Sequence, residues 1–133
     1  MAGGFGALLR RAGAGYRQPQ VVSFLFVLPD PELLDELKSW GTKVISSATT
    51  VEEARWLEAH GADAVIAQGL EAGGHRGMFL TEDVTTQVGT FALLPQIIAA
   101  VRLPVIAAGG IADAAGVRAA RALGAAAVQV GTA

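Results

Sequence analysis

The sequence predicts an α/β fold in which helices cover a parallel sheet. Hydrophobic residues make up 52% of the 133 residues and charged residues only 17%, whereas an average soluble domain carries about 25% charged residues. Aromatic residues are scarce at 6% while glycine occurs 17 times, so Val, Ile, Leu and Ala must build the core, as is typical of parallel sheets. Short β-branched runs also alternate with helical patterns, which predicts repeated strand–helix–strand units.

The first unit begins after residue 20. The apolar run Val21–Val27 predicts a buried strand. Asp30 is a suitable N-cap, Pro31 fits the first helical position and Gly41 ends the helix.

The second unit repeats this order with a stronger helix signal. Lys43–Ser47 predicts a strand, and Thr50 followed by Glu53 has the spacing of a capping box. The helix ends at Gly61, and Ala64–Gln68 predicts the third strand.

A long irregular stretch, residues 69–89, precedes the remaining elements. Thr90–Val101 predicts a helix in which Pro95 is tolerated near the first turn. Pro104–Ala108 predicts the fourth strand.

The last unit completes five predicted strands. Asp113 caps an alanine-rich helix that ends at Gly124, and Ala126–Val130 is the fifth strand. Five strands at this spacing fit either an open doubly wound sheet or part of a (β/α)8 barrel. A whole barrel needs about 250 residues, so this chain has the length of roughly half of one.

Charge and cysteine content exclude several classes of function. The net charge is −2, which gives no basic surface for nucleic acid. No cysteine is present, which excludes disulfides, thiolate metal sites and a cysteine nucleophile. The longest mainly apolar run, Val21–Pro29, is far shorter than the roughly 20 residues of a membrane helix, so no membrane span is expected.

Residues 1–20 differ from the rest, and we expect a poorly ordered leader ahead of a folded domain over residues 21–133. The segment is rich in glycine and arginine and has no acidic residue. This composition also fits a transit-like leader or a start codon placed inside a longer reading frame.

Polar and glycine residues gather where the predicted strands end, which is where α/β sheets bind ligands. Gly109-Gly110 and Gly131-Thr132 follow the fourth and fifth strands. Glycines let main-chain N–H groups approach an anion closely, and the Thr132 hydroxyl adds a donor. We therefore predict a phosphate site, with tight turns alone as the alternative explanation.

The irregular stretch holds the candidate catalytic residue His75, flanked by glycines. Its imidazole could act as a general base near neutral pH or could cap a backbone carbonyl. Glu71 could serve as an acid, a ligand or an orienting residue, and Arg76 could pair with an anionic substrate, with Glu71 or with solvent. Too few ligands surround these residues for a metal site, so no metal is expected. His60, at a predicted helix end, is interpreted as structural.

Four motifs, in collinear order, resemble those of bacterial nitronate monooxygenases, formerly called 2-nitropropane dioxygenases. They are Gln68–Gly77 (QGLEAGGHRG), Gly89–Gln96 (GTFALLPQ), Pro104–Asp113 (PVIAAGGIAD) and Ala126–Ala133. The resemblance extends from about Val21 to Ala133 and implies a partial (β/α)8 TIM barrel, with five parallel strands corresponding to strands four to eight.

The resemblance also implies a cofactor and a reaction. The family binds FMN without a covalent link and oxidises alkyl nitronates with O₂ to a carbonyl compound and nitrite. His75 matches the base that takes the α-proton from neutral nitroalkanes. The residues implied in cofactor binding are Ser47, Gln68, Gly74, Gly109, Gly110, Gly131 and Thr132.

The chain departs from the family pattern at the end of its first strand, where the family tends to have His and Gly in place of Leu25 and Val27. Strands one to three are also missing from the resemblance, so the chain could be an inactive fragment. The alternatives are an FMN-dependent enoyl-acyl-carrier-protein reductase, which shares the Glu71–His75 motif, and a non-catalytic remnant. Unpaired sheet edges suggest a homo-oligomer, and we expect a cytoplasmic location.

Overall fold

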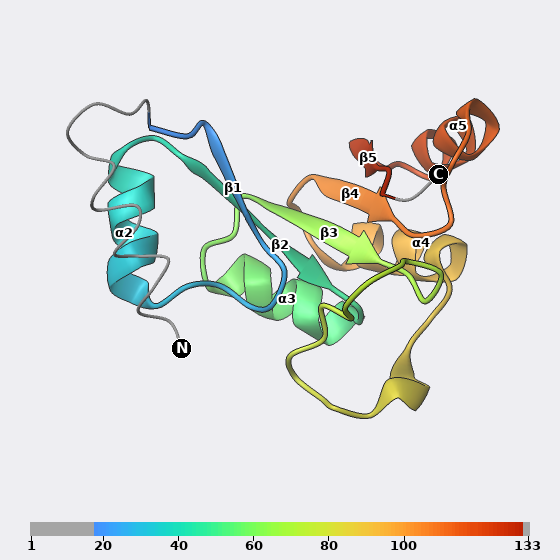
Figure 1. Cartoon of the computed structure of the whole chain (residues 1–133), viewed down its shortest axis with the longest axis horizontal. Coiled ribbons are helices and arrows are strands. Elements are labelled where there is room, and N and C mark those ends of the chain that lie inside the picture. Colours follow the sequence, from blue (N-terminus) through green and yellow to red (C-terminus); the bar gives the residue numbers. More distant parts are fainter. Residues whose placement is uncertain (1–17, 132–133) are drawn as a thin grey trace.

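The computed structural model describes residues 18–131, which form one five-stranded parallel sheet with helices packed along it (Figure 1). Most of the predicted leader and Thr132 lie outside the described residues. The strands are β1 (Val21–Phe24), β2 (Lys43–Ala48), β3 (Ala64–Gln68), β4 (Val105–Ala108) and β5 (Ala127–Gln129). The helices are α2 (Pro31–Ser39), α3 (Val51–Ala59), α4 (Thr90–Ala100) and α5 (Ala114–Ala122), with a short 3₁₀ turn, η2 (Val84–Thr86).

The strand order decides between the two predicted architectures. The strands follow one another as β1-β2-β3-β4-β5, and every neighbouring pair is parallel. A doubly wound sheet reverses its strand order at a switch point, and this sheet has no such reversal over residues 18–131. The chain is therefore a half-barrel, which confirms the predicted partial TIM barrel.

The residue types at the helix ends explain where each helix starts and stops. Asp30 and Thr50 accept hydrogen bonds from the N–H groups of the third helical residues at 3.0 and 3.2 Å, and Asp113 does the same at 2.8 Å. Gly41 and Gly61 adopt φ values of +76° and +101°, which suit glycine at a helix end. The predicted caps and stops of these helices are confirmed.

Two local predictions differ from the structure. The first strand ends at Phe24 rather than Val27, because the chain bends there and Val27 has a φ of +47°. Pro95 lies at the sixth position of α4 rather than near its first turn. The carbonyl of Phe91 consequently lacks its usual helical donor, and Phe91 is 42% exposed, where solvent can replace that bond.

The core lies between the sheet and the helices. Leucines and isoleucine from three helices are completely buried against the sheet, and they include Leu37, Leu57, Leu93, Leu94 and Ile97. The strands contribute Val44, Val65 and Ala107 to the same cluster. The opposite face of the sheet and the carboxyl ends of its strands are thereby left for other contacts. No helix within residues 18–131 is both long and apolar enough to cross a membrane.

Candidate functional site

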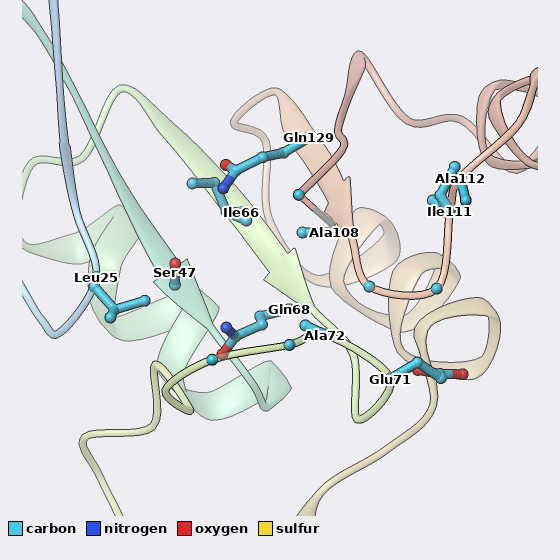
Figure 2. Close-up of a pocket in the computed structure, with 15 residues that line it drawn as sticks. Leu25, Ser47, Ile66, Gln68, Glu71, Ala72, Ala108, Ile111, Ala112 and Gln129 are labelled. Atoms are coloured by element: carbon cyan, nitrogen blue, oxygen red, sulfur yellow. The ribbon is translucent and has the colours of Figure 1, made fainter. Parts of the chain in front are cut away.

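A cavity of about 520 Å³ opens at the carboxyl ends of the strands (Figure 2). This volume is within the range of about 300–1,000 Å³ that small-molecule sites occupy. Six of the seven predicted cofactor residues line it, namely Ser47, Gln68, Gly74, Gly109, Gly110 and Gly131. The other lining residues are Leu25, Ile66, Glu71, Ala72, Gly73, Ala108, Ile111, Ala112 and Gln129.

The sheet register brings side chains of several strands to this cavity. Gln68 pairs in register with Ala108, which pairs with Gln129, so one row crosses β3, β4 and β5 at the edge of the cavity. Ser47 pairs with Ile66, two residues before Gln68 on β3, and both line the same cavity. Residues that are distant in the sequence therefore meet because parallel strands end together.

Gln68 fixes the loop that follows β3. The side chain is buried, and its Oε1 accepts a hydrogen bond from the Gly77 N–H at 2.6 Å, while its Nε2 donates to the His75 carbonyl at 3.0 Å. The two bonds settle the amide orientation, because one partner is a donor and the other an acceptor. The sequence placed Gln68 at the cofactor, and the structure adds that its amide holds the His75 segment.

Glycine at position 77 is required by this close approach. A Cβ there would lie 2.7 Å from the Ser47 Cβ and 2.8 Å from the Leu25 carbonyl oxygen. Both distances are too short for a real contact, so the loop could not lie this close to β1 and β2 with any other residue.

His75 directly follows the cavity-lining Gly74 in the chain but is not itself among the residues that line the cavity. Its side chain is exposed, and its ring meets Phe26 edge-on with centroids 6.2 Å apart. The preceding glycines, Gly73 and Gly74, do line the cavity. The main chain of His75 is thus fixed by Gln68 while the imidazole stays accessible to solvent.

Arg76 stabilises the beginning of the loop. Its guanidinium donates hydrogen bonds to the carbonyls of Gly69 and Leu70 at 2.9 and 3.1 Å, and also to the carbonyl of Ala72. The sequence left three roles open for Arg76, namely pairing with an anionic substrate, with Glu71 or with solvent. None of them describes this arrangement completely. Arg76 binds backbone carbonyls of its own loop, with its charge near Glu71.

Glu71 caps a helix from outside it. Gly89 precedes α4 and supplies no side-chain cap. The Glu71 Oε2 accepts from the Thr90 N–H at 2.8 Å and from the Thr90 hydroxyl at 2.9 Å. A carboxylate is favourable at this positive end of a helix. The signal for this role was a helix start without a capping residue.

The surroundings of Glu71 lower its pKa. Partial burial alone would raise the pKa, but hydrogen bonds from its own N–H and from Thr90, together with the charge of Arg76, outweigh that effect. The pKa of Glu71 is therefore held below its ordinary value of 4.5. Among the described residues lining the cavity, Glu71 is the only one with a titratable side chain.

The turn after β4 has the backbone freedom that the sequence predicted. Gly109 and Gly110 adopt φ values of +116° and +66°. A Cβ on Gly109 would lie 2.7 Å from the Thr90 hydroxyl oxygen and 2.9 Å from the Ala72 nitrogen. Among residues 18–131, no neighbouring atom lies within 4 Å of where a Cβ on Gly131 would lie.

The lining determines which kinds of ligand this cavity can hold. An anion here would depend on main-chain N–H groups, since no lysine or arginine lines the cavity within the described part of the chain. The amide and hydroxyl side chains suit a polar ring, while Leu25, Ile66 and Ile111 form apolar walls. Across residues 18–131, no group of three or more His, Cys, Asp or Glu side chains could bind a metal ion together.

Comparisons with known proteins agree with one another. A family model described as nitronate monooxygenase matches residues 11–133. The curated nitronate monooxygenase of Paraburkholderia phytofirmans is 53% identical over 116 residues, which are 87% of this chain and 32% of that protein. The chain thus spans about a third of the length of the curated relatives that it matches.

Solved structures support the same relationship. The nitroalkane oxidase from Streptomyces ansochromogenes superposes with a TM-score of 0.86 at 47% identity, over 98% of this chain and 38% of that one. FabK from Thermotoga maritima gives a TM-score of 0.67 at 36% identity, over 99% of this chain and 47% of that one.

Proposed function

The chain belongs to the nitronate monooxygenase family, and we propose that it carries the FMN-binding and proton-abstracting part of such an enzyme. The proposed reaction is the oxidation of an alkyl nitronate by O₂ to a carbonyl compound and nitrite. The observation that carries the proposal is that one cavity is lined by six of the seven residues implied in cofactor binding, which come from the carboxyl ends of β2 and β3 and from the segments after β3, β4 and β5.

The chemistry of the residues that line this cavity supports the proposal of FMN binding. Gly109, Gly110 and Gly131, with Thr132 beyond the described residues, would hold the phosphate through main-chain N–H groups and a hydroxyl. Ser47, Gln68 and Gly74 would lie along the flavin ring. Bound FMN would supply the electron transfer from the nitronate to O₂, while the protein positions it and controls access.

His75 is the proposed base for neutral nitroalkanes. A ring nitrogen of His75 would take the proton from the carbon next to the nitro group, which leaves the nitronate and an imidazolium. An alkyl nitronate has already lost this proton and needs no base. The hydrogen bond from Gln68 to the His75 carbonyl supports a fixed position for the loop that carries the base.

Two other functions remain as alternatives. An FMN-dependent enoyl-acyl-carrier-protein reductase would use a nicotinamide donor, and a non-catalytic remnant would bind a phosphate or a partner without turnover. Gln68 and Arg76 favour the monooxygenase, since the reductases tend to have Glu and an aliphatic residue at these positions. The three hydrogen bonds that the Arg76 guanidinium donates to backbone carbonyls support a residue whose identity matters to the loop.

A flavin-retention experiment tests the proposal directly. The purified chain is mixed with FMN and desalted, and the visible absorption spectrum is recorded. Retained flavin, with oxygen consumption and nitrite release on ethyl nitronate, is the expected result. NADH oxidation with an enoyl thioester would favour the reductase, and a colourless protein would show that the half-barrel alone does not hold FMN.

A substitution at His75 separates the two substrates. His75→Asn should spare turnover of ethyl nitronate and abolish turnover of nitroethane, because only the neutral substrate needs the base. His60→Asn is the matched control, since His60 stacks on Trp56 at the end of α3, away from the lining of the cavity. Equal losses on both substrates in His75→Asn would refute the assignment.

Three further proposals concern the setting of the enzyme. We propose small-molecule nitronates or nitroalkanes and O₂ as its substrates, and the cytoplasm as its location on family grounds. Association into a homo-oligomer stays a prediction, based on β1 and β5 lying at the edges of the described sheet. Elution as a monomer at micromolar concentration would contradict it.

A further inference from the structure

Glu53 lies in the third position of α3, and its side chain is completely buried. Glutamate is rarely buried without partners that satisfy its charge. The capping-box spacing predicts that the carboxylate returns to the start of its own helix. Thr50 does accept from the Glu53 N–H, and the carboxylate does return to the helix start, but it binds Thr49, one residue before the N-cap, and it also reaches Phe79 in the long loop.

Four donors surround this carboxylate. Its Oε2 accepts from the N–H and the hydroxyl of Thr49 at 2.7 and 2.8 Å. Its Oε1 accepts from the N–H groups of Phe79 and Leu80 at 2.7 and 3.1 Å. A carboxylate has about four acceptor positions and no donor, so this set of partners uses its full capacity.

The same carboxylate is connected to the far end of the long loop. Gln87 donates from its Nε2 to the Thr49 hydroxyl oxygen at 3.0 Å, and that hydroxyl in turn donates to Glu53. The middle of the loop, at Phe79 and Leu80, is therefore bound directly to the buried Glu53 carboxylate, and its end, at Gln87, is linked to the same carboxylate through the Thr49 hydroxyl.

Trp56 gives a second, independent contact between α3 and the loop. It lies three residues after Glu53, so both side chains are on one face of the helix. The Trp56 ring meets the Phe79 ring edge-on, with centroids 5.3 Å apart. Helix α3 thus holds Phe79 by its main chain and by its ring.

We propose that Glu53 is a positioning residue for His75, an inference that rests on the proposed function of His75. Gln68 fixes the main chain at His75 and Gly77 from the sheet side. Glu53 fixes Phe79 and Leu80 from the helix side, with a single residue between the two anchored parts. Residues 75–80 have no helix or strand of their own, so these side chains define where the imidazole lies.

The test compares Glu53→Gln with Glu52→Gln, which removes the same charge from an exposed neighbour on the same helix. In Glu53→Gln an amide group faces N–H donors, so amide hydrogen exchange at Phe79 and Leu80 should be about tenfold faster or more. The ratio of nitroethane to ethyl nitronate turnover should fall on the order of tenfold, because only nitroethane needs a positioned base. Glu52→Gln should change neither quantity.

Each outcome decides the proposal. The proposal would be overturned if amide exchange at Phe79 and Leu80 and the turnover ratio were the same in Glu53→Gln as in Glu52→Gln. Equal losses of nitroethane and ethyl nitronate turnover in Glu53→Gln would also overturn it. If the unaltered chain turns over neither substrate, the proposed function fails, and exchange at residues 75–80 still tests the anchoring by Glu53.

A second variant covers the case in which Glu53→Gln does not fold. Thr49→Val keeps Glu53 and removes only the hydroxyl between Glu53 and Gln87. Exchange over residues 79–87 should then rise about threefold, in line with the loss of one hydrogen-bonded link. Unchanged exchange in this variant would overturn the proposal.

Discussion

The loops after β3 and β4 border the same cavity, yet they are held in different ways. The turn at Gly109-Gly110 is short, and two positive φ values give it its shape. The loop over residues 69–89 is long and is held by side chains, chiefly Gln68, Glu53 and Arg76. A short turn needs backbone freedom, whereas a long irregular loop needs partners for its backbone polar groups.

The two loops also contact each other. The Thr90 hydroxyl lies 2.9 Å from both the Glu71 carboxylate and the Gly109 carbonyl oxygen. The start of the long loop, at Ala72, fills the space where a Cβ on Gly109 would lie. A change in the short turn should therefore disturb the long loop as well.

The largest expected effect comes from Gly109→Ala. The residue has a φ of +116°, and an added Cβ would lie 2.9 Å from the Ala72 nitrogen. Left-handed strain and overpacking together should lower the free energy of unfolding by about 3 kcal/mol. Urea unfolding measures the loss, and flavin retention should disappear with it.

Gly74→Ala is the matched control for that substitution. Gly74 also has a positive φ, of +76°, but within the described part of the chain no atom lies within 4 Å of the added Cβ. Only the backbone strain remains, so the loss should be about 1 kcal/mol. Equal losses in the two variants would show that the packing between the two loops contributes nothing.

Glu71→Gln tests the cap between the loop and α4 through its pH dependence. A folded-state pKa below the ordinary value of 4.5 means that the carboxylate stabilises the fold above about pH 4.5. This stabilisation is lost as the pH falls through the folded-state pKa. Because Glu71 is largely exposed, solvent screening limits the effect to about 1 kcal/mol or less.

The measurement is urea unfolding of the unaltered chain and of Glu71→Gln, each at about pH 6 and at about pH 3. The difference in unfolding free energy between the unaltered chain and Glu71→Gln should be larger at the higher pH and smaller at the lower one. Asp63 and Asp83 also have lowered pKa values, but they occur in both proteins and cancel in the difference. A difference that stays constant with pH would contradict the cap.

The difference between the short turn after β4 and the long loop over residues 69–89 also explains what the sequence could predict. Helix caps, glycine stops and strand runs depend on neighbouring residues, so Asp30, Thr50 and Asp113 were assigned their structural roles correctly. The cavity-lining glycines Gly109, Gly110 and Gly131 were predicted from strand ends, because parallel strands end at one edge of a sheet. Ser47, Gln68 and Gly74 were implied by the family resemblance.

The side-chain anchors of the long loop could not be predicted in this way. Glu53 contacts Phe79, 26 positions away, and Glu71 contacts Thr90, 19 positions away. The capping-box spacing marks Glu53 and the helix start at Gly89 lacks a cap, but neither local pattern identifies the distant partner that each carboxylate binds. The bend after Phe24 was missed for a related reason, because a β-branched residue at position 27 favours a continuing strand over a left-handed turn.

The smallest effect concerns the turn after β1, which has neither a glycine nor a long anchored loop. Val27 has a φ of +47°, although a β-branched residue is strained in this region. The strain should be roughly 1–2 kcal/mol, and glycine would relieve it. The greater freedom of glycine in the unfolded chain removes about 0.5–1 kcal/mol of that gain.

Val27→Gly should therefore raise the free energy of unfolding by about 0.5 kcal/mol, measured by urea unfolding. Val27→Ala is the control, since alanine keeps the Cβ and with it most of the strain, so it should bring no gain. The Ser46 hydroxyl lies 2.8 Å from the Val27 carbonyl oxygen, and neither substitution removes this contact. If Val27→Gly stabilises the fold and Val27→Ala does not, this turn needs the same backbone freedom that Gly109 and Gly110 give to the turn after β4. A loss of stability would show instead that the valine side chain holds the turn by packing, as side chains hold the loop after β3.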